Sequence, residues 1–127
     1  MNLFSFIDKY SCYTFEEVEF NEVDNIILSM LSYLELSGIV SRNKYNPKRL
    51  SIVGEEYFKN FDKKETRILS IRKAIKILKN IKDTRRYGDL LLYNYMYEIS
   101  GDNQFGALTI EINKKLVYVS FEGTDHL

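Results

Sequence analysis

The sequence has few of the residues that bind metals, form disulfides or exchange protons at neutral pH. Its 127 residues include one Cys (Cys12), one His (His126) and no Trp. A single Cys forms no internal disulfide, and one Cys with one His falls short of the three or four ligands of a typical zinc site. His126 lies one residue from the last, where a side chain is seldom held rigidly enough for general-base catalysis. Cys12 is expected to be a packed or inert thiol. We therefore expect no metal, no cofactor and no catalytic His.

Long apolar runs are absent as well. No run approaches the roughly 18 residues that indicate a membrane span, and the opening Met1-Asn2-Leu3-Phe4 lacks the basic and apolar regions of a secretory signal. With one Cys, this pattern favours the reducing cytoplasm. Hydrophobic residues make up 45% and charged residues 28% of the chain, which is typical of one folded domain and excludes a disordered tail.

Complete catalytic motifs are also missing. The nucleophile elbow Gly-x-Ser-x-Gly does not occur, because none of the six glycines brackets a Ser at that spacing. No Gly-rich phosphate loop follows a predicted strand. The adjacent carboxylates Glu16-Glu17 and Glu55-Glu56 diverge on a helix or strand, so we expect them to be solvated. The chain by itself therefore lacks a hydrolytic triad.

Acidic and basic residues are equal in number, 18 of each, but they are segregated. Residues 1–41 contain one Lys against seven acids, residues 42–86 contain fifteen bases against five acids, and residues 87–127 contain two bases against six acids. Such a basic block meets phosphate in nucleic-acid binders; otherwise it covers acidic neighbours or forms a solvated face. The chain has no recognisable nucleic-acid module, so a nucleic-acid partner is the less favoured interpretation.

Two helices are predicted in the first half of the chain. Asn21 is suited to cap a helix that carries Asp24 in its first turn and ends at Gly38. Ser51 is suited to cap a second helix over about 52–60, after the break at the single Pro.

The clearest helical pattern covers roughly Glu65 to Ile81. Apolar residues recur there at helical spacing, and basic residues take the remaining surface. The apolar stripe consists of Ile68, Ile71, Ala74, Ile75, Ile77, Leu78 and Ile81, and the basic residues are Arg72, Lys73, Lys76, Lys79 and Lys82.

After Tyr87-Gly88-Asp89 the pattern changes from helical to extended. Strands are predicted over 90–99, 105–112 and 116–121, separated by turn-forming residues. Their spacing predicts an antiparallel meander of three strands. Both alternating sets of the last strand are largely apolar, which is typical of a strand buried on both faces in the middle of a sheet.

The last predicted strand runs directly into Glu122-Gly123-Thr124-Asp125. Gly123 allows a tight turn, and Thr124 and Asp125 offer a hydroxyl and a carboxylate. In α/β-hydrolases one oxyanion-hole N–H group comes from a loop at the end of such a strand. A plain turn explains the same residues, and composition alone favours it.

The stretch from Val119 to Asp125 resembles the Phe-Arg-Gly-Thr motif of class 3 lipases, with Glu122 in place of the usual Arg. The chain as a whole is similar to the Mbeg-like proteins, a lipase-like bacterial family of the α/β-hydrolase superfamily. The segments that carry this resemblance are 20–29 with 31–34, 86–90 with 92–95, and 105–109 leading into Phe121-Glu122-Gly123-Thr124-Asp125.

This resemblance implies a role for the last residues. Thr124, after Gly123, would lie in the oxyanion loop and direct its hydroxyl or N–H at the anionic oxygen of a tetrahedral intermediate. A carboxylate at Glu122 would repel that oxygen unless it points away. Family members continue into a nucleophile elbow and later triad residues, none of which occurs among these 127 residues.

We therefore expect an α/β chain that forms the N-terminal portion of an α/β-hydrolase fold. It is a single incomplete domain, mainly helical over 1–86, with a three-stranded β-meander over 87–127 that ends in an oxyanion-type loop. The function expected is that of an N-terminal fragment of a cytoplasmic lipase- or esterase-like serine hydrolase. It is inactive alone, and only the full-length parent acts on an acyl ester. An exposed sheet edge predicts self-association. The alternative is a small interaction module whose basic helix 65–82 binds nucleic acid or an acidic partner.

Overall fold

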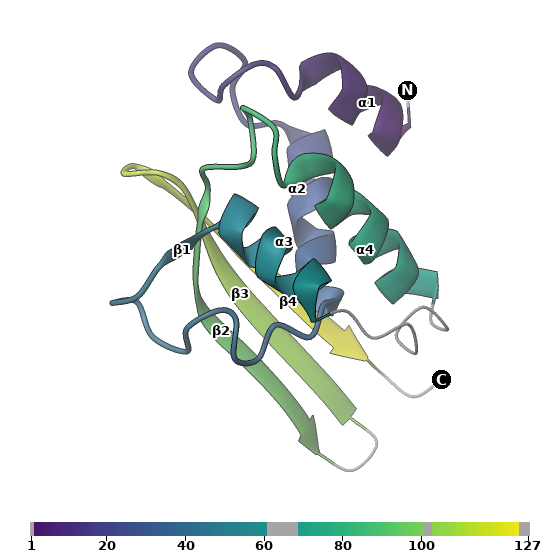
Figure 1. The fold of residues 1–127 in the computed structure, drawn as a ribbon, viewed down its shortest axis with the longest axis vertical. Helices are drawn as coiled ribbons and strands as arrows, with labels where there is room; N and C mark the ends of the chain where they lie inside the picture. Colours follow the sequence, from purple (N-terminus) through teal and green to yellow (C-terminus); the bar gives the residue numbers. More distant parts are fainter. Residues whose placement is uncertain (1, 61–68, 101–102, 125–127) are drawn as a thin grey trace.

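The computed structural model describes residues 2–60, 69–100 and 103–124, and its helices pack on one antiparallel sheet. Figure 1 shows the helical elements α1 (Leu3–Tyr10), α2 (Glu22–Ser29), α3 (Leu50–Lys59) and α4 (Leu69–Ile81), with the 3-10 turn η1 (Met30–Tyr33) after α2. The strands are β1 (Lys48–Arg49), β2 (Leu91–Ser100), β3 (Asn103–Asn113) and β4 (Leu116–Thr124). They lie in the order β1-β2-β3-β4, which agrees with an α/β chain but gives four strands instead of the expected three.

The additional strand, β1, is two residues long. Lys48 pairs with Leu92 and Arg49 with Leu91, at the side of β2 that faces away from β3. Such a strand has no sequence pattern of its own, because it is defined by its pairing partner.

The helix predicted after Asn21 is present and is capped as expected. The Asn21 side chain accepts hydrogen bonds from the N–H groups of Val23 and Asp24, and the Asp24 carboxylate accepts one from the Asn21 N–H. This is a reciprocal capping box. The α-helix ends at Ser29 and tightens into η1, so Gly38, at φ +79°, lies in the loop beyond it and does not end the helix.

The prediction that Ser51 caps the next helix is wrong. Helix α3 begins at Leu50, and its N-cap Arg49 makes no side-chain capping bond. The N–H of Leu50 donates to the Leu90 carbonyl at 2.8 Å, and that of Ser51 donates to the Gly88 carbonyl at 3.0 Å. The segment that leads into β2 thus satisfies backbone donors of the first turn of α3, and no side-chain cap is needed.

Helix α4 confirms the amphipathic pattern over 69–81, whereas the predicted start at 65–68 lies outside the described residues. Ala74, Ile77, Leu78 and Ile81 are fully buried. The cations on the remaining surface are exposed, namely Arg72, Lys73, Lys76 and Lys79. These four residues of the apolar stripe are therefore core, as its spacing indicates, whereas Ile71 and Ile75 are half-buried.

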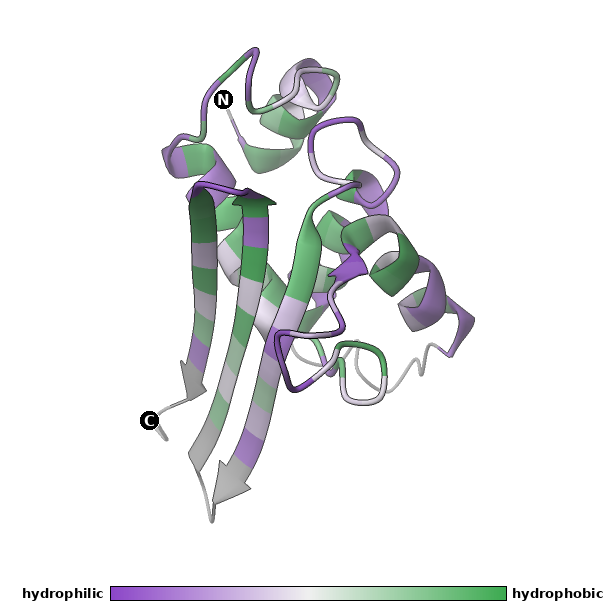
Figure 2. Ribbon diagram, turned by 90° about the vertical axis from the view of Figure 1, so that its left-hand side faces the viewer, coloured by the Kyte–Doolittle hydropathy of each residue, from purple (hydrophilic) through white to green (hydrophobic). Residues whose placement is uncertain are grey.

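The helical layer covers only one face of the sheet (Figure 2). On this inner face, side chains of β2 and β3 join the helices in the core, namely Leu92, Tyr95, Leu108 and Ile110. On the opposite, outer face of β4, Val117, Val119 and Phe121 are exposed. The expectation of a strand buried on both faces in mid-sheet is thus wrong. In the described residues, β4 is an edge strand and no element covers its outer face.

Candidate functional site

The predicted site residues Gly123 and Thr124 lie at the C-terminal end of β4. Gly123 pairs with Phe105 and Thr124 with Gln104, so the strand extends three residues past the predicted end at Phe121. The expected tight turn at Gly123 is therefore not formed, because the ladder with β3 continues through it. Asp125 and His126 lie outside the described residues.

Glu122 points to the inner face of the sheet, beneath the helices. Its side chain is 2% exposed, whereas that of the preceding Phe121 is 62% exposed on the outer face. Oε2 of Glu122 is buried and has no hydrogen-bond partner in the described part of the chain. Burial raises the pKa of this carboxyl above its ordinary value. Sequence reasoning identified position 122 as unusual but did not place it in the core.

Two other inner-face residues of β4 bind oxygen acceptors of α2. The Tyr118 hydroxyl lies 2.5 Å from Asn25 Oδ1 and 3.1 Å from the Asn25 carbonyl oxygen, and the Ser120 hydroxyl donates to the Ser29 carbonyl at 3.1 Å. The edge strand is thereby fixed along α2 towards η1. These contacts position the backbone that leads to Gly123 and Thr124.

A second polar cluster, which the sequence did not predict, joins Arg86 to Asp24. Arg86 Nε donates to Asp24 Oδ1 at 3.0 Å and Nη2 donates to Oδ2 at 2.6 Å, and both side chains are fully buried. The Tyr87 hydroxyl donates to the same Asp24 Oδ1 at 2.6 Å. Burial opposes the charge of Arg86, but the contacts with Asp24 outweigh it and raise the Arg86 pKa. Burial and Asp24 also raise the pKa of Tyr87.

The remaining donors of Arg86 organise the loop before α2. Nη1 donates to the carbonyls of Tyr13, Thr14 and Val18, and Nη2 also donates to that of Glu19. The Phe15 ring lies 3.9 Å from the guanidinium carbon. Because both terminal nitrogens and Nε are engaged, this cluster is structural and leaves no donor positioned for a ligand. Its only sequence signals were Asp24 at the capping position and the Arg-Tyr pair at 86–87.

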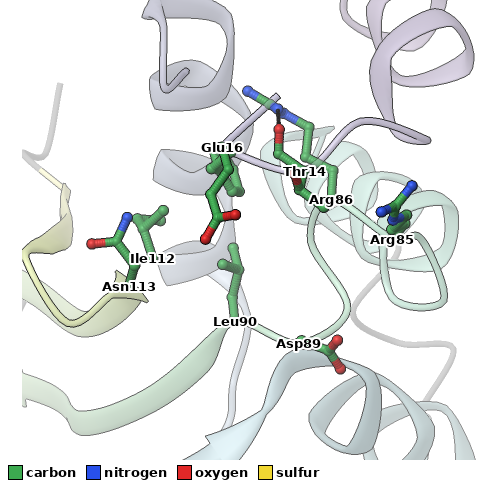
Figure 3. A pocket seen from close by; sticks show the side chains of 9 residues that line it. Thr14, Glu16, Arg85, Arg86, Asp89, Leu90, Ile112 and Asn113 are labelled. Atoms are coloured by element: carbon green, nitrogen blue, oxygen red, sulfur yellow. Dashed lines mark hydrogen bonds between the residues drawn. The ribbon is translucent and has the colours of Figure 1, made fainter. Parts of the chain in front are cut away.

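A cavity of about 230 Å³ lies beside this cluster (Figure 3). It is smaller than the roughly 300–1,000 Å³ of typical small-molecule sites. Its walls combine both signs of charge and hold no nucleophile paired with a base. They are formed by Thr14, Phe15, Glu16, Arg85, Arg86, Asp89, Leu90, Ile112 and Asn113.

The other residues singled out in the sequence lie at the surface. Cys12 is exposed rather than packed, and its Sγ lies 3.8 Å from the Lys9 carbonyl. Glu16 and Glu55 are exposed, as expected. Glu17 pairs with Arg85 at 3.5 Å, and Glu56 is half-buried and pairs with Lys48 at 2.8 Å.

The described residues contain no group of three or more His, Cys, Asp or Glu side chains that could hold a metal ion. Among the helices described, none is long and apolar enough to cross a membrane. Comparisons with family models, with curated proteins and with solved structures gave no match.

Proposed function

We propose that the chain is the N-terminal part of a lipase- or esterase-like serine hydrolase of the α/β-hydrolase type, and that it does not hydrolyse esters alone. The observation that carries the proposal is the free side of β4. This strand is paired only with β3 in the described residues, and its outer face is apolar and exposed.

An α/β-hydrolase sheet is covered by helices on both faces and is extended by further parallel strands. The described chain has helices on one face and an edge strand that ends in Phe121-Glu122-Gly123-Thr124. The free edge of β4 is where the next strand would pair. The exposed outer face, which includes Val119 and Phe121, is where a further helix would pack.

The orientation of Glu122 supports an oxyanion role for the residues that follow it. Its carboxyl is buried under the helical layer, on the inner face of the sheet. A carboxylate directed into the site would repel a developing oxyanion. Because Glu122 points into the core, its replacement of the usual Arg is compatible with a backbone donor at Thr124, the last residue of β4.

The test combines two measurements. The purified 127-residue chain is incubated with p-nitrophenyl esters and with a serine-directed inhibitor, and we expect neither turnover nor labelling. The DNA downstream of codon 127 is then translated in three frames, and we expect a helix followed by Gly-x-Ser-x-Gly. Co-expression of that segment should give an ester hydrolase. Turnover by the chain alone that the inhibitor abolishes, or the lack of an elbow downstream, would overturn the proposal.

A second candidate function rests on the exposed cations of α4. Arg72, Lys73 and Lys79 are exposed and form no ion pair with another described residue, while Lys76 lies over the Phe4 ring at 4.3 Å. Such a row suits an interaction module for nucleic acid or an acidic partner. Salt-dependent retention on heparin or DNA, lost in the variant K73E/K76E/K79E, would favour this function over the hydrolase proposal.

A further inference from the structure

The inner face of β4 presents three polar residues in alternation, Tyr118, Ser120 and Glu122. Tyr118 and Ser120 donate hydrogen bonds to oxygen acceptors of α2, at Asn25 and Ser29 respectively. Glu122 occupies the third place in this row, where the chain of α2 has continued into η1. An ionised carboxylate has no hydrogen to donate, so it cannot repeat the contact made by the two hydroxyls.

Gly106 on β3 lies beside Glu122 and allows the Ser32 carbonyl of η1 to approach the sheet closely. Gly106 and Glu122 are paired across the ladder. A Cβ at Gly106 would lie 3.1 Å from the Ser32 carbonyl oxygen of η1 and 3.5 Å from Glu122 Oε2. Two oxygen acceptors thus border the same small space above Gly106. Oε2 has no donor in the described part of the chain.

On this face, the titratable groups of the elements nearest Glu122 are tyrosines. Tyr97 on β2 pairs with Gly106 in the same row, and the titratable group on η1 is Tyr33. The acids Glu22 and Asp24 lie in the first turn of α2, away from η1, and Asp24 is bound to Arg86. Burial is what raises the Glu122 pKa, without a contribution from a charged side chain of the described residues. The cations of α4, which packs against η1, are exposed; they are Arg72, Lys73, Lys76 and Lys79.

We propose that Glu122 is a proton-controlled latch, which holds the C-terminal end of β4 against η1 when its carboxyl is protonated and releases that end when it ionises. In the protonated form the carboxyl has an O–H group. This group can donate a hydrogen bond to an acceptor beside Gly106, as the hydroxyls of Tyr118 and Ser120 do to α2. In the ionised form a buried charge faces a carbonyl oxygen, which is costly. The latch controls the backbone that leads to Gly123 and Thr124. It does not depend on the hydrolase proposal, since its test measures this chain alone.

The direction of the pH effect follows from linkage. A carboxyl that has a higher pKa when buried than when exposed binds its proton more tightly in the closed form. Raising the pH from below the ordinary pKa of 4.5 through the raised value therefore favours the open form. The equilibrium constant for opening rises by at most about tenfold per pH unit across this interval and is constant on either side.

The experiment is amide hydrogen exchange of the full chain, measured residue by residue by NMR between about pH 4 and about pH 8 and corrected for intrinsic exchange rates. We expect amides at 120–122 to open more readily as the pH rises. The amide of Leu92 in β2, a strand that does not pair with β4, serves as the internal reference and should not follow this rise. In Glu122→Gln, which keeps the shape and is permanently uncharged, the rise should be lost and the closed form kept at every pH.

Glu98→Gln is the matched control, because Glu98 is an exposed carboxylate in the neighbouring strand β2. It should retain the profile of the unmodified chain. The pH dependence of exchange in the unmodified chain tests the latch by itself, so the proposal remains testable if Glu122→Gln folds poorly. A flat profile at 120–122, a rise shared equally by Leu92, or a rise that persists in Glu122→Gln would overturn the latch.

Discussion

Arg86 and Asp24, 62 residues apart in the sequence, form a bidentate ion pair with no exposure of either side chain. The pair joins the N-terminus of α2 to the turn that precedes β2. Arg86 also donates hydrogen bonds to backbone carbonyls of the loop before α2. A buried polar cluster therefore connects the helical layer to the segment that leads into the sheet, and Asp24 is the acceptor that Arg86 and Tyr87 share in it.

Asp24→Asn should destabilise the fold strongly. The substitution leaves the Arg86 guanidinium buried without a counter-charge, and breaking a buried ion pair in this way costs about 3–5 kcal/mol. Denaturant unfolding monitored by circular dichroism measures the change. Glu17→Gln, which breaks the exposed pair with Arg85, is the control and should leave the midpoint nearly unchanged. Equal midpoints for the two variants would contradict a dominant role of the cluster.

The parts of this fold that the sequence predicted are those with a local cause. The Asn21 and Asp24 capping box needs only four consecutive residues, and the stripe of α4 needs only its own periodicity. The main strands likewise follow from residue type and from the turns between them. Local patterns were therefore sufficient for element type but not for element ends.

The missed features depend on partners that are distant in sequence. Strand β1 exists because Lys48 and Arg49 pair with β2, and α3 begins at Leu50 because the Leu90 carbonyl accepts its N–H. The apolar outer face of β4 gave the impression of a central strand, since a sequence does not show which of two apolar faces is covered. For the candidate site, Glu122 was identified as unusual, but its burial depends on α2 and η1, distant in sequence, which pack against β4.

Stability should fall at alkaline pH because two tyrosines are buried. Burial raises the pKa of Tyr87 and Tyr95 above the ordinary value of 10.0. Their contribution to the free energy of unfolding is complete below about pH 10. It is lost progressively above this pH, because the two phenols ionise in the unfolded chain before they ionise in the folded one. Each contributes a slope of up to about 1.4 kcal/mol per pH unit. Unfolding free energies measured between about pH 9 and about pH 11 should show this fall.

Single variants separate the alkaline effect from other groups. Tyr95→Phe should reduce the slope of stability against pH, because one raised pKa is removed. Tyr45→Phe should not, since Tyr45 is 78% exposed. The same slope in both variants would show that the buried phenols are not responsible.

Asn94 should tolerate Gly but not Val. It has φ +52°, in the left-handed region, at the register shift between Tyr93 and Met96. That shift lets Tyr95 point inward, where its hydroxyl binds Leu34 and Leu36. Asn94→Val should cost about 1–2 kcal/mol because a β-branched residue disfavours this φ.

Asn94→Gly is the matched comparison, since Gly adopts this conformation freely. Its thermal midpoint should be close to that of the unmodified chain. A midpoint for Asn94→Val as high as that for Asn94→Gly would mean that β2 adjusts its register without strain.

The free side of β4 should make the isolated chain self-associate. From Leu116 to Phe121 this edge strand carries no charged residue and no Pro, the features that usually protect an edge, and Phe121 is 62% exposed. Size-exclusion chromatography with light scattering should show a mass that rises with protein concentration.

Phe121→Lys should shift the chain towards monomer, because a charge on the outer face opposes burial against a second copy. Tyr45→Lys adds the same charge at an exposed aromatic residue in the loop before β1, and should leave the association unchanged. A sharp monomer peak with cooperative unfolding for the unmodified chain would contradict both the association and the free-sheet argument for the hydrolase proposal.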